Sequence, residues 1–180
     1  RLIRRVLTAL GGAAIIAVDS APTVVSSTFV QNVADAEAGA VVCRGTSSAS
    51  IANSVLWANA PLQVLDLDAS TTSISFSDVQ GGWFGPGLAN LDTDPLFANF
   101  GTGDVSLAAG SPCIDAGSSA LSSMLAVDLA GLPRFHDDPC VADVGMPDGN
   151  APVIDLGAYE FPSVSEASCS SLSADITTIS

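Results

Sequence analysis

A short phrase of alternating small and apolar residues recurs three times in the first half of the chain. Its copies are APTVVSSTFVQN, SASIANSVLWAN and TTSISFSDVQGG, and they begin at residues 21, 48 and 71, so that successive copies lie 27 and 23 residues apart. A repeat with a constant register constrains the fold more strongly than any local pattern, because each unit then packs against the next. Two apolar columns result when the copies are aligned: Val24 with Ile51 and Ile74, and Phe29 with Leu56 and Val79.

The repeat predicts an all-β solenoid with one coil per unit. Each unit is too short for a strand–helix–strand motif, which needs about 30 residues or more, and the frame of a leucine-rich repeat is absent. We therefore expect a parallel β-helix of about three coils over residues 13–85, with both columns facing a narrow core. Asn32 and Asn59 coincide at a polar corner, and we expect them to stack as a structural ladder rather than to bind a ligand.

The composition is strongly acidic and narrows the choice of partners. The chain has five basic residues, none of them lysine, against 19 acidic ones, and its net charge is −14. Phosphate groups are bound by basic patches, so this charge argues against nucleic acid or an anionic membrane surface as a partner. An acidic polysaccharide would need a bridging divalent cation. The abundance of Ser, Thr, Gly and Asp is typical of β-rich extracellular chains.

The first twelve residues have two interpretations. RLIRR followed by the apolar run VLTALGGAAIIAV has the pattern of a secretory signal peptide, and this run is too short to span a bilayer. Alternatively, residues 1–12 form a short helix that caps the open end of the β-helix, with Leu2, Ile3 and Leu10 on one face. We favour the cap, because GGAAIIAV also fits the repeat.

The second half of the chain lacks the repeat and is rich in Asp, Gly and Pro. We expect residues 86–161 to form a loop-rich region that wraps the last coil and covers its open strand edge, followed by a flexible tail over residues 162–180. Within this region VIDLGAYEF, residues 153–161, alternates as a strand would. Arg134 lies in a turn and is expected to be the structural ion-pair partner of a carboxylate.

Six short segments follow one another in order and at sensible spacings: SVLWAN (54–59), DVQGGW (78–83), NLDTDPLF (90–97), GSPCIDAG (110–117), DLAGLPRFHDDP (128–139) and VIDLGAYEF (153–161). In this combination the chain resembles the C-terminal part of bacterial right-handed parallel β-helix proteins of the pectin-lyase-like type, most closely those with a choice-of-anchor Q domain. The resemblance implies an exported protein whose β-helix is often followed by a sorting or anchoring segment. No catalytic residues are established for this family as a class, so none is carried over. The chain departs from the family in having only about three recognisable coils, as a fragment of a longer β-helix would, and a tail without a recognisable anchor.

The four cysteines allow three disulfide pairings. We favour Cys113 with Cys140, because both lie in the loop-rich second half, and a disulfide would suit an exported protein. Cys43 lies in the apolar run VVCRG and is expected to be a buried free thiol, since free cysteine packs as a small apolar residue.

Paired acidic residues are the candidates for catalysis. The resemblance implies that enzymes of this fold cleave polysaccharides with paired carboxylates or with a cationic base aided by calcium, and residues two apart on a strand share a face. The aligned coils show no column of charged residues, however, so we expect no catalytic site. His136 is expected to be a solvated loop residue. The acidic pairs are Asp92 with Asp94, Asp66 with Asp68, and Asp137 with Asp138.

Two sets of residues are candidates for binding. Ca²⁺ is the best candidate cofactor, with Asp92, Asp94 and Asp104 as ligands, because oxygen-rich clusters suit a hard cation. Trp57 and Trp83 are candidate ligand-binding residues, since an indole at a coil corner could lie flat against a sugar ring. The sequence thus predicts an exported or cell-surface β-helix module with a structural, adhesive or glycan-binding role. The alternative is a polysaccharide lyase or glycoside hydrolase of the pectin-lyase-like fold.

Overall fold

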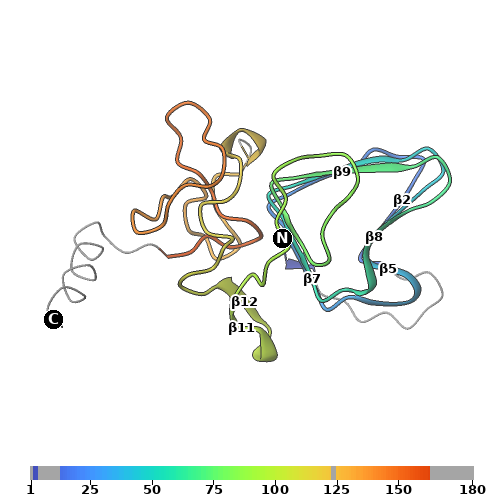
Figure 1. The fold of residues 1–180 in the computed structure, drawn as a ribbon, viewed down its shortest axis with the longest axis horizontal. Coiled ribbons are helices and arrows are strands. Elements are labelled where there is room, and N and C mark those ends of the chain that lie inside the picture. Colours follow the sequence, from blue (N-terminus) through green and yellow to red (C-terminus); the bar gives the residue numbers. More distant parts are fainter. Residues whose placement is uncertain (1, 4–12, 123–124, 163–180) are drawn as a thin grey trace, which may run out of the picture.

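The computed structural model describes residues 2–3, 13–122 and 125–162, and this part of the chain consists almost entirely of β-strands and loops. Three parallel sheets stack their strands in successive coils, which confirms the predicted all-β class and a parallel β-helix of about three coils. In Figure 1 the stacked coils are seen end-on and have a three-sided outline, and the loop-rich region lies beside them. The helices of the described residues are two short 3₁₀ helices, η1 (Phe100–Thr102) and η2 (Ser119–Ser122). None of the helices in this part of the chain has the length and apolar character that crossing a membrane requires.

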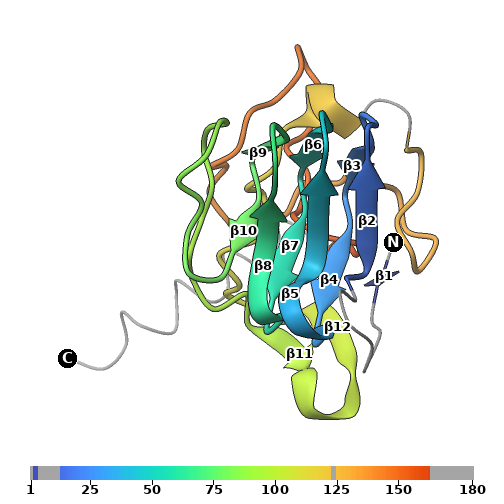
Figure 2. The ribbon, with the colours of Figure 1, turned by 90° about the vertical axis from the view of Figure 1, so that its right-hand side faces the viewer.

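Each coil contributes one strand to each sheet. The strand orders are β1-β4-β7-β10, β2-β5-β8 and β3-β6-β9, and all neighbours within these sheets are parallel. Figure 2 shows β2, β5 and β8 side by side along the stack. The strands are β1 (Leu2–Ile3), β2 (Ile15–Val18), β3 (Thr23–Val25), β4 (Thr28–Val30), β5 (Val33–Arg44), β6 (Ser48–Ala52), β7 (Val55–Trp57), β8 (Ala60–Asp66), β9 (Thr71–Ser75) and β10 (Asp78–Val79).

The N-terminal segment includes a strand where a capping helix was predicted. Leu2–Ile3 form β1, which pairs with β4 so that Ile3 lies opposite Phe29. The predicted helix is therefore wrong for these two residues, because their backbone joins the ladder of a parallel sheet. The other residues of the predicted cap, 1 and 4–12, and residues 163–180 of the predicted tail lie outside the described part of the chain.

The two predicted apolar columns line the core of the β-helix. Strand register places the members of each column opposite one another in successive coils, and all six side chains belong to or pack against one apolar cluster. Val24 is partly buried, and the other five are at most 1% exposed. Side chains alternate between the faces of a strand, so Thr28 and Val55, which precede Phe29 and Leu56, point outward from the coil.

The change of period from 27 to 23 residues is absorbed inside β5. At the start of β5, Val33 pairs with Ala60 of β8, 27 positions later. At its end, Cys43 pairs with Asp66, 23 positions later, and the register shifts twice between these two pairs. The extra residues form a bulge. Gly39 allows the bulged chain to approach its neighbour, because a Cβ there would lie 2.1 Å from the carbonyl oxygen of Asn32.

Hydrogen-bonded side chains stack at the corners between strands. Asn32 donates from its backbone N–H and from its side-chain amide to Oδ1 of Asn59, at 3.0 and 2.8 Å, which confirms the predicted ladder. At a second corner the N–H of Ser27 donates to the hydroxyl of Ser54, whose own N–H donates to the hydroxyl of Ser77. In both corners the left-handed backbone conformation falls one residue before the ladder, with φ between +47° and +55°, at Ser26, Gln31, Asn53, Ala58 and Phe76.

The edge of the last coil is covered by the residues that follow it. Residues 86–92 run along β9 and β10 and form backbone hydrogen bonds of 2.8–2.9 Å with residues 74–79. Gly87 permits this approach, because its φ is +127° and a Cβ there would lie 1.7 Å from the carbonyl oxygen of Ile74. Strand edges that would otherwise be open to another chain are therefore paired within this one.

The rest of the loop-rich region packs beside the stack rather than over its end. It includes the antiparallel hairpin of β11 (Phe97–Asn99) and β12 (Asp104–Leu107), and it covers the outer face of the sheet that contains β4 and β7 (Figure 1). The N–H of Ala158 donates to the hydroxyl of Thr28 at 2.9 Å. The outward-facing side chains of this sheet are thus buried by a second apolar cluster instead of meeting solvent.

Residues 153–161 do not form the predicted strand. Their backbone donors bond to separate carbonyl groups and side chains, such as the N–H of Leu156 to the carbonyl of Cys113 at 2.9 Å and that of Asp155 to Glu160 at 3.2 Å. An alternating run becomes a strand only where a neighbouring strand supplies a ladder of partners. In the described chain this segment lies among loops, so the ladder does not form.

Candidate functional site

A cavity of about 510 Å³ opens near the end of the β-helix, between the start of β8 and the turn that follows β10. Its lining combines amide, aromatic and aliphatic side chains from residues 59, 61–64 and 79–85, all within the described chain, and includes no acidic or basic residue. Pockets that bind small molecules are mostly apolar with a few placed polar groups. This lining is instead more polar than apolar.

Two adjacent aromatic residues form one side of the cavity. The indole of Trp83 is partly buried against the core cluster, and its N–H donates to the carbonyl of Pro86 at 2.9 Å. Gly85 passes close to this ring, since a Cβ there would lie 2.4 Å from a ring carbon. Phe84, in contrast, is 96% exposed. The cavity therefore has one firmly held ring and one ring that faces solvent.

An amide network reaches the cavity from the corner ladder. Nδ2 of Asn59 donates to Oε1 of Gln63 at 2.6 Å, and Nε2 of Gln63 donates to Oε1 of Gln80 at 3.3 Å. Oε1 of Gln80 also accepts from the N–H of Ala58 at 2.7 Å. These bonds orient the amides of Gln63 and Gln80 at the cavity, and an amide can both donate to and accept from a ligand hydroxyl.

Trp57 lies on a different surface from Trp83. It is the last residue of β7 and packs, partly buried, against the apolar cluster between the β4–β7 sheet and the loop-rich region. The structure therefore does not bring the two indoles into one site, and of the two only Trp83 lines the cavity.

The structure does not gather the predicted calcium ligands Asp92, Asp94 and Asp104 into one cluster. Asp92 accepts a hydrogen bond from the N–H of Gly81 at 2.8 Å, whereas Asp94 and Asp104 accept from the N–H two residues later, at 2.9 and 3.1 Å. Hydrogen bonds from Ser106 lower the pKa of the Asp104 carboxyl. These carboxylates fix separate turns.

Asp66 and Asp68 also bond to backbone groups at the coil corners. Asp66 accepts from the N–H and the hydroxyl of Thr72, at 2.8 and 2.6 Å. Asp68 accepts from the N–H of Gly45 in the preceding coil at 2.9 Å. Both carboxylates therefore shape corners of the β-helix.

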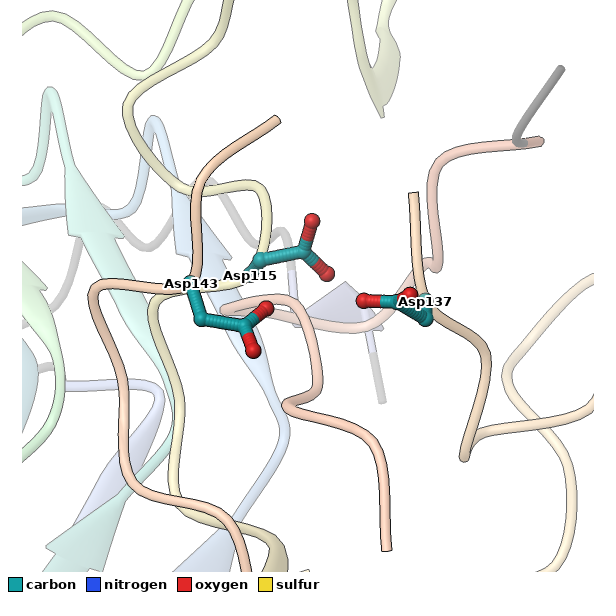
Figure 3. Close-up of side chains that lie close together, drawn as sticks. All are labelled: Asp115, Asp137 and Asp143. Carbon is teal, nitrogen blue, oxygen red and sulfur yellow. The ribbon is translucent and has the colours of Figure 1, made fainter. Parts of the chain in front are cut away.

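Asp137 joins a cluster that the sequence pattern did not indicate. Carboxylate oxygens of Asp115, Asp137 and Asp143 lie within 4.8 Å of one another, and Figure 3 shows the three side chains directed toward a common space. Asp138, the predicted partner of Asp137, is buried and accepts from the N–H of Cys140 at 2.9 Å. Asp115 lies in the GSPCIDAG segment, but only the folded chain brings it beside a loop so much later in the sequence.

The predicted disulfide between Cys113 and Cys140 is wrong. Cys113 is a buried free thiol that packs in the cluster beneath the loop-rich region and donates to Oδ2 of Asp78 at 3.5 Å. Cys140 is disulfide-bonded, but not to Cys113, which is free. Burial raises the pKa of the Cys113 thiol and raises the pKa of Asp78 to about 6, so burial disfavours the ionised form of both groups. Cys43 is a buried free thiol, as predicted.

Arg134 forms the predicted structural ion pair. Its guanidinium donates to Oε1 of Glu160 at 2.5 Å and to the carbonyl of Gly157 at 3.2 Å, and both charged side chains are at most 2% exposed. Burial and then the nearby Asp155 raise the pKa of Glu160, and Arg134 opposes that shift. A guanidinium held in this way fastens two loops and is not presented to a substrate.

Comparisons of the chain with protein-family models, with curated proteins and with solved structures found no match. The structure alone therefore defines the class of protein: a parallel β-helix of about three coils with a loop-rich region against one of its sheets.

Proposed function

We propose that this protein is an exported or cell-surface β-helix module that binds neutral glycans in the cavity beside Trp83. The six sequence segments that resemble pectin-lyase-like β-helix proteins with a choice-of-anchor Q domain support the family and the location. The observation that carries the binding role is a cavity without charged side chains, lined by an exposed phenyl ring and by hydrogen-bonded amides. A sugar ring has apolar C–H faces, which pack on aromatic rings, and hydroxyl groups, which hydrogen-bond with amides.

The charge of the chain narrows the class of glycan. The net charge is −14, and the cavity lining contains no basic residue that could pair with a uronate or sulfate group. An acidic glycan would be repelled by the field of the whole protein. Neutral glucans, mannans and related polymers are therefore the proposed ligands.

Binding is favoured over cleavage because of the residues at the cavity. Lyases and hydrolases need a base or a pair of carboxyl groups at the scissile bond. The residues that line this cavity, all of them described, include no titratable side chain. A sugar bound there would meet aromatic, amide and aliphatic side chains and backbone groups, none of which can act as a general acid or base.

Affinity electrophoresis against neutral glucans, mannan, pectin and alginate tests the proposal. We expect the protein to bind a neutral polymer and Phe84→Ala to weaken binding by at least about tenfold, which corresponds to about 1.4 kcal/mol. Phe84 is 96% exposed, so its removal should leave stability unchanged. The control is Val18→Ala, which removes an apolar side chain that is 56% exposed on the first strand of the sheet that contains β8.

Two results would overturn the proposed function. Failure to bind any neutral polymer would remove it altogether, and equal binding by Phe84→Ala, Gln80→Ala and the unaltered chain would place the ligand elsewhere. Release of reducing or unsaturated ends from a polysaccharide, lost on substitution of an acidic residue, would favour the enzymatic alternative.

A further inference from the structure

The acidic cluster of Asp115, Asp137 and Asp143 lies where two segments of the loop-rich region meet. The carbonyl oxygen of Asp115 accepts backbone hydrogen bonds from the N–H groups of Val144 and Gly145, both at 3.0 Å. These bonds hold the two segments side by side. Asp115 and Asp143 lie at or next to this junction, and Asp137 faces them from another stretch of chain (Figure 3), with carboxylate oxygens of all three within 4.8 Å of one another.

Asp115 is the feature that needs an explanation. It is completely buried, and neither of its carboxylate oxygens has a hydrogen-bond partner. Its N–H donates to Oδ1 of Asp155 at 2.8 Å and its φ is +49°, so the backbone is held in a conformation that fixes the direction of the side chain. Burying an ionised carboxylate without a partner is strongly unfavourable. The site therefore needs a positive charge or a proton.

The carboxylates around Asp115 increase this need. Burial raises the pKa of Asp115 to about 7, and the next causes of the increase are three carboxylates, those of Asp155, Asp137 and Asp143. The backbone N–H of Asp138 offsets a smaller part of the shift without forming a hydrogen bond of normal geometry. The surroundings of Asp115 are thus suited to hold a cation that several negative groups share.

We propose that Asp115, Asp137 and Asp143 bind a divalent cation, and that this cation is Ca²⁺. A set of carboxylate oxygens suits hard cations rather than the metals that prefer imidazole or thiolate. Ca²⁺ takes six to eight oxygen ligands in variable geometry, so water can complete the three carboxylates supplied by irregular loops, whereas Mg²⁺ demands a near-ideal octahedron. The ligands come from both segments, and the ion therefore clamps the loop-rich region. The inference does not depend on the proposed glycan binding.

Titration calorimetry and thermal unfolding of the full chain, stripped of metal with EDTA and exchanged into clean buffer, test the site. With CaCl₂ we expect saturable binding and a higher Tm, because a ligand that binds only the folded state stabilises it. Asp143 is exposed, so Asp143→Asn should fold normally and bind Ca²⁺ at least about tenfold more weakly. Asp115→Asn should abolish the Ca²⁺-dependent rise in Tm. The control Asp148→Asn changes an exposed acidic residue of the same region and should bind as the unaltered chain does.

Three results would overturn the proposal: no saturable Ca²⁺ binding at millimolar concentration, equal Ca²⁺ affinity of Asp143→Asn and the unaltered chain, or tighter binding of MgCl₂ than of CaCl₂. The first would show that a shared proton, rather than an ion, neutralises Asp115. If Asp115→Asn does not fold, the comparison of Asp143→Asn with Asp148→Asn decides the outcome.

Discussion

Replacing Asn59 by alanine should remove three buried hydrogen bonds between two coils. Oδ1 of Asn59 accepts from the N–H and from the side-chain amide of Asn32, and its Nδ2 donates to the carbonyl of Phe29 at 2.9 Å. Asn59 is 6% exposed and Asn32 1%, so water replaces these partners poorly. A fourth bond, from Nδ2 to Gln63, lies nearer to solvent.

The expected loss follows from the three buried hydrogen bonds. A typical intramolecular hydrogen bond contributes about 1 kcal/mol net, so their loss should lower the free energy of unfolding by about 3 kcal/mol. A domain of ordinary stability has about 5–15 kcal/mol in all. Because stability in a coil stack depends on interfaces between neighbouring repeats, this substitution weakens one of few such interfaces.

Urea unfolding followed by far-ultraviolet circular dichroism measures this difference. The matched variant is Gln63→Ala, which removes the outer bond to Asn59 and leaves the buried ladder intact, and it should cost less than about 1 kcal/mol. If Asn59→Ala unfolds within about 0.5 kcal/mol of Gln63→Ala, the ladder adds no net stability. The reasoning that the corner amides bind the coils together would then be refuted.

Three further substitutions examine the core, a buried acid and a close approach. Ile51→Ala should lower the free energy of unfolding by about 2–5 kcal/mol, since Ile51 is 1% exposed, and Ile16→Ala, at a side chain 50% exposed, should cost much less in the same urea titration. Burial raises the pKa of Asp78 from 3.8 to about 6, so the folded chain holds this proton more tightly than the unfolded chain. The protonated Asp78 therefore contributes about 3 kcal/mol to the free energy of unfolding, which is fully present below about pH 4 and is lost as the pH rises through 6. Asp78→Asn should remove this pH-dependent contribution. If the variant shows the same pH profile of stability as the unaltered chain, the assignment to Asp78 is wrong. Gly87→Ala should destabilise the chain far more than Gly110→Ala, because both glycines have positive φ but only a Cβ at position 87 meets the backbone of Ile74; equal melting temperatures would count against a paired edge.

The β-helix itself could be predicted from the sequence. Residues that recur at a constant spacing define which side chains stack, and backbone pairing between coils then needs no further information. Val24, Ile51 and Ile74 therefore lie in register, and Asn32 meets Asn59, as the aligned copies predict. The alignment also showed that the spacing changes from 27 to 23 residues between successive coils. It did not show that the difference is accommodated by a bulge within β5.

The contacts of the loop-rich region were decided by tertiary structure. This region has no repeat, and its residues meet partners far away in the chain, as Ala158 meets Thr28. Local alternation predicted a strand over residues 153–161, which has no neighbouring strand in the described chain. The shared location of Cys113 and Cys140 in the loop-rich half suggested a disulfide, but Cys113 is a free thiol that faces Asp78 of the β-helix.

The candidate sites divide in the same way. The sequence by itself indicated Trp57 and Trp83 as binding candidates, because both lie at expected coil corners, but it did not show which of the two lines a cavity. Only the folded chain shows that the loop-rich region packs against Trp57 and that Asp115 lies beside Asp137 and Asp143. Pairing between repeats can be predicted from the spacing of residues, because equivalent positions stack in successive coils. The packing of an irregular segment depends on the fit of many side chains from distant parts of the chain, and no residue spacing predicts it.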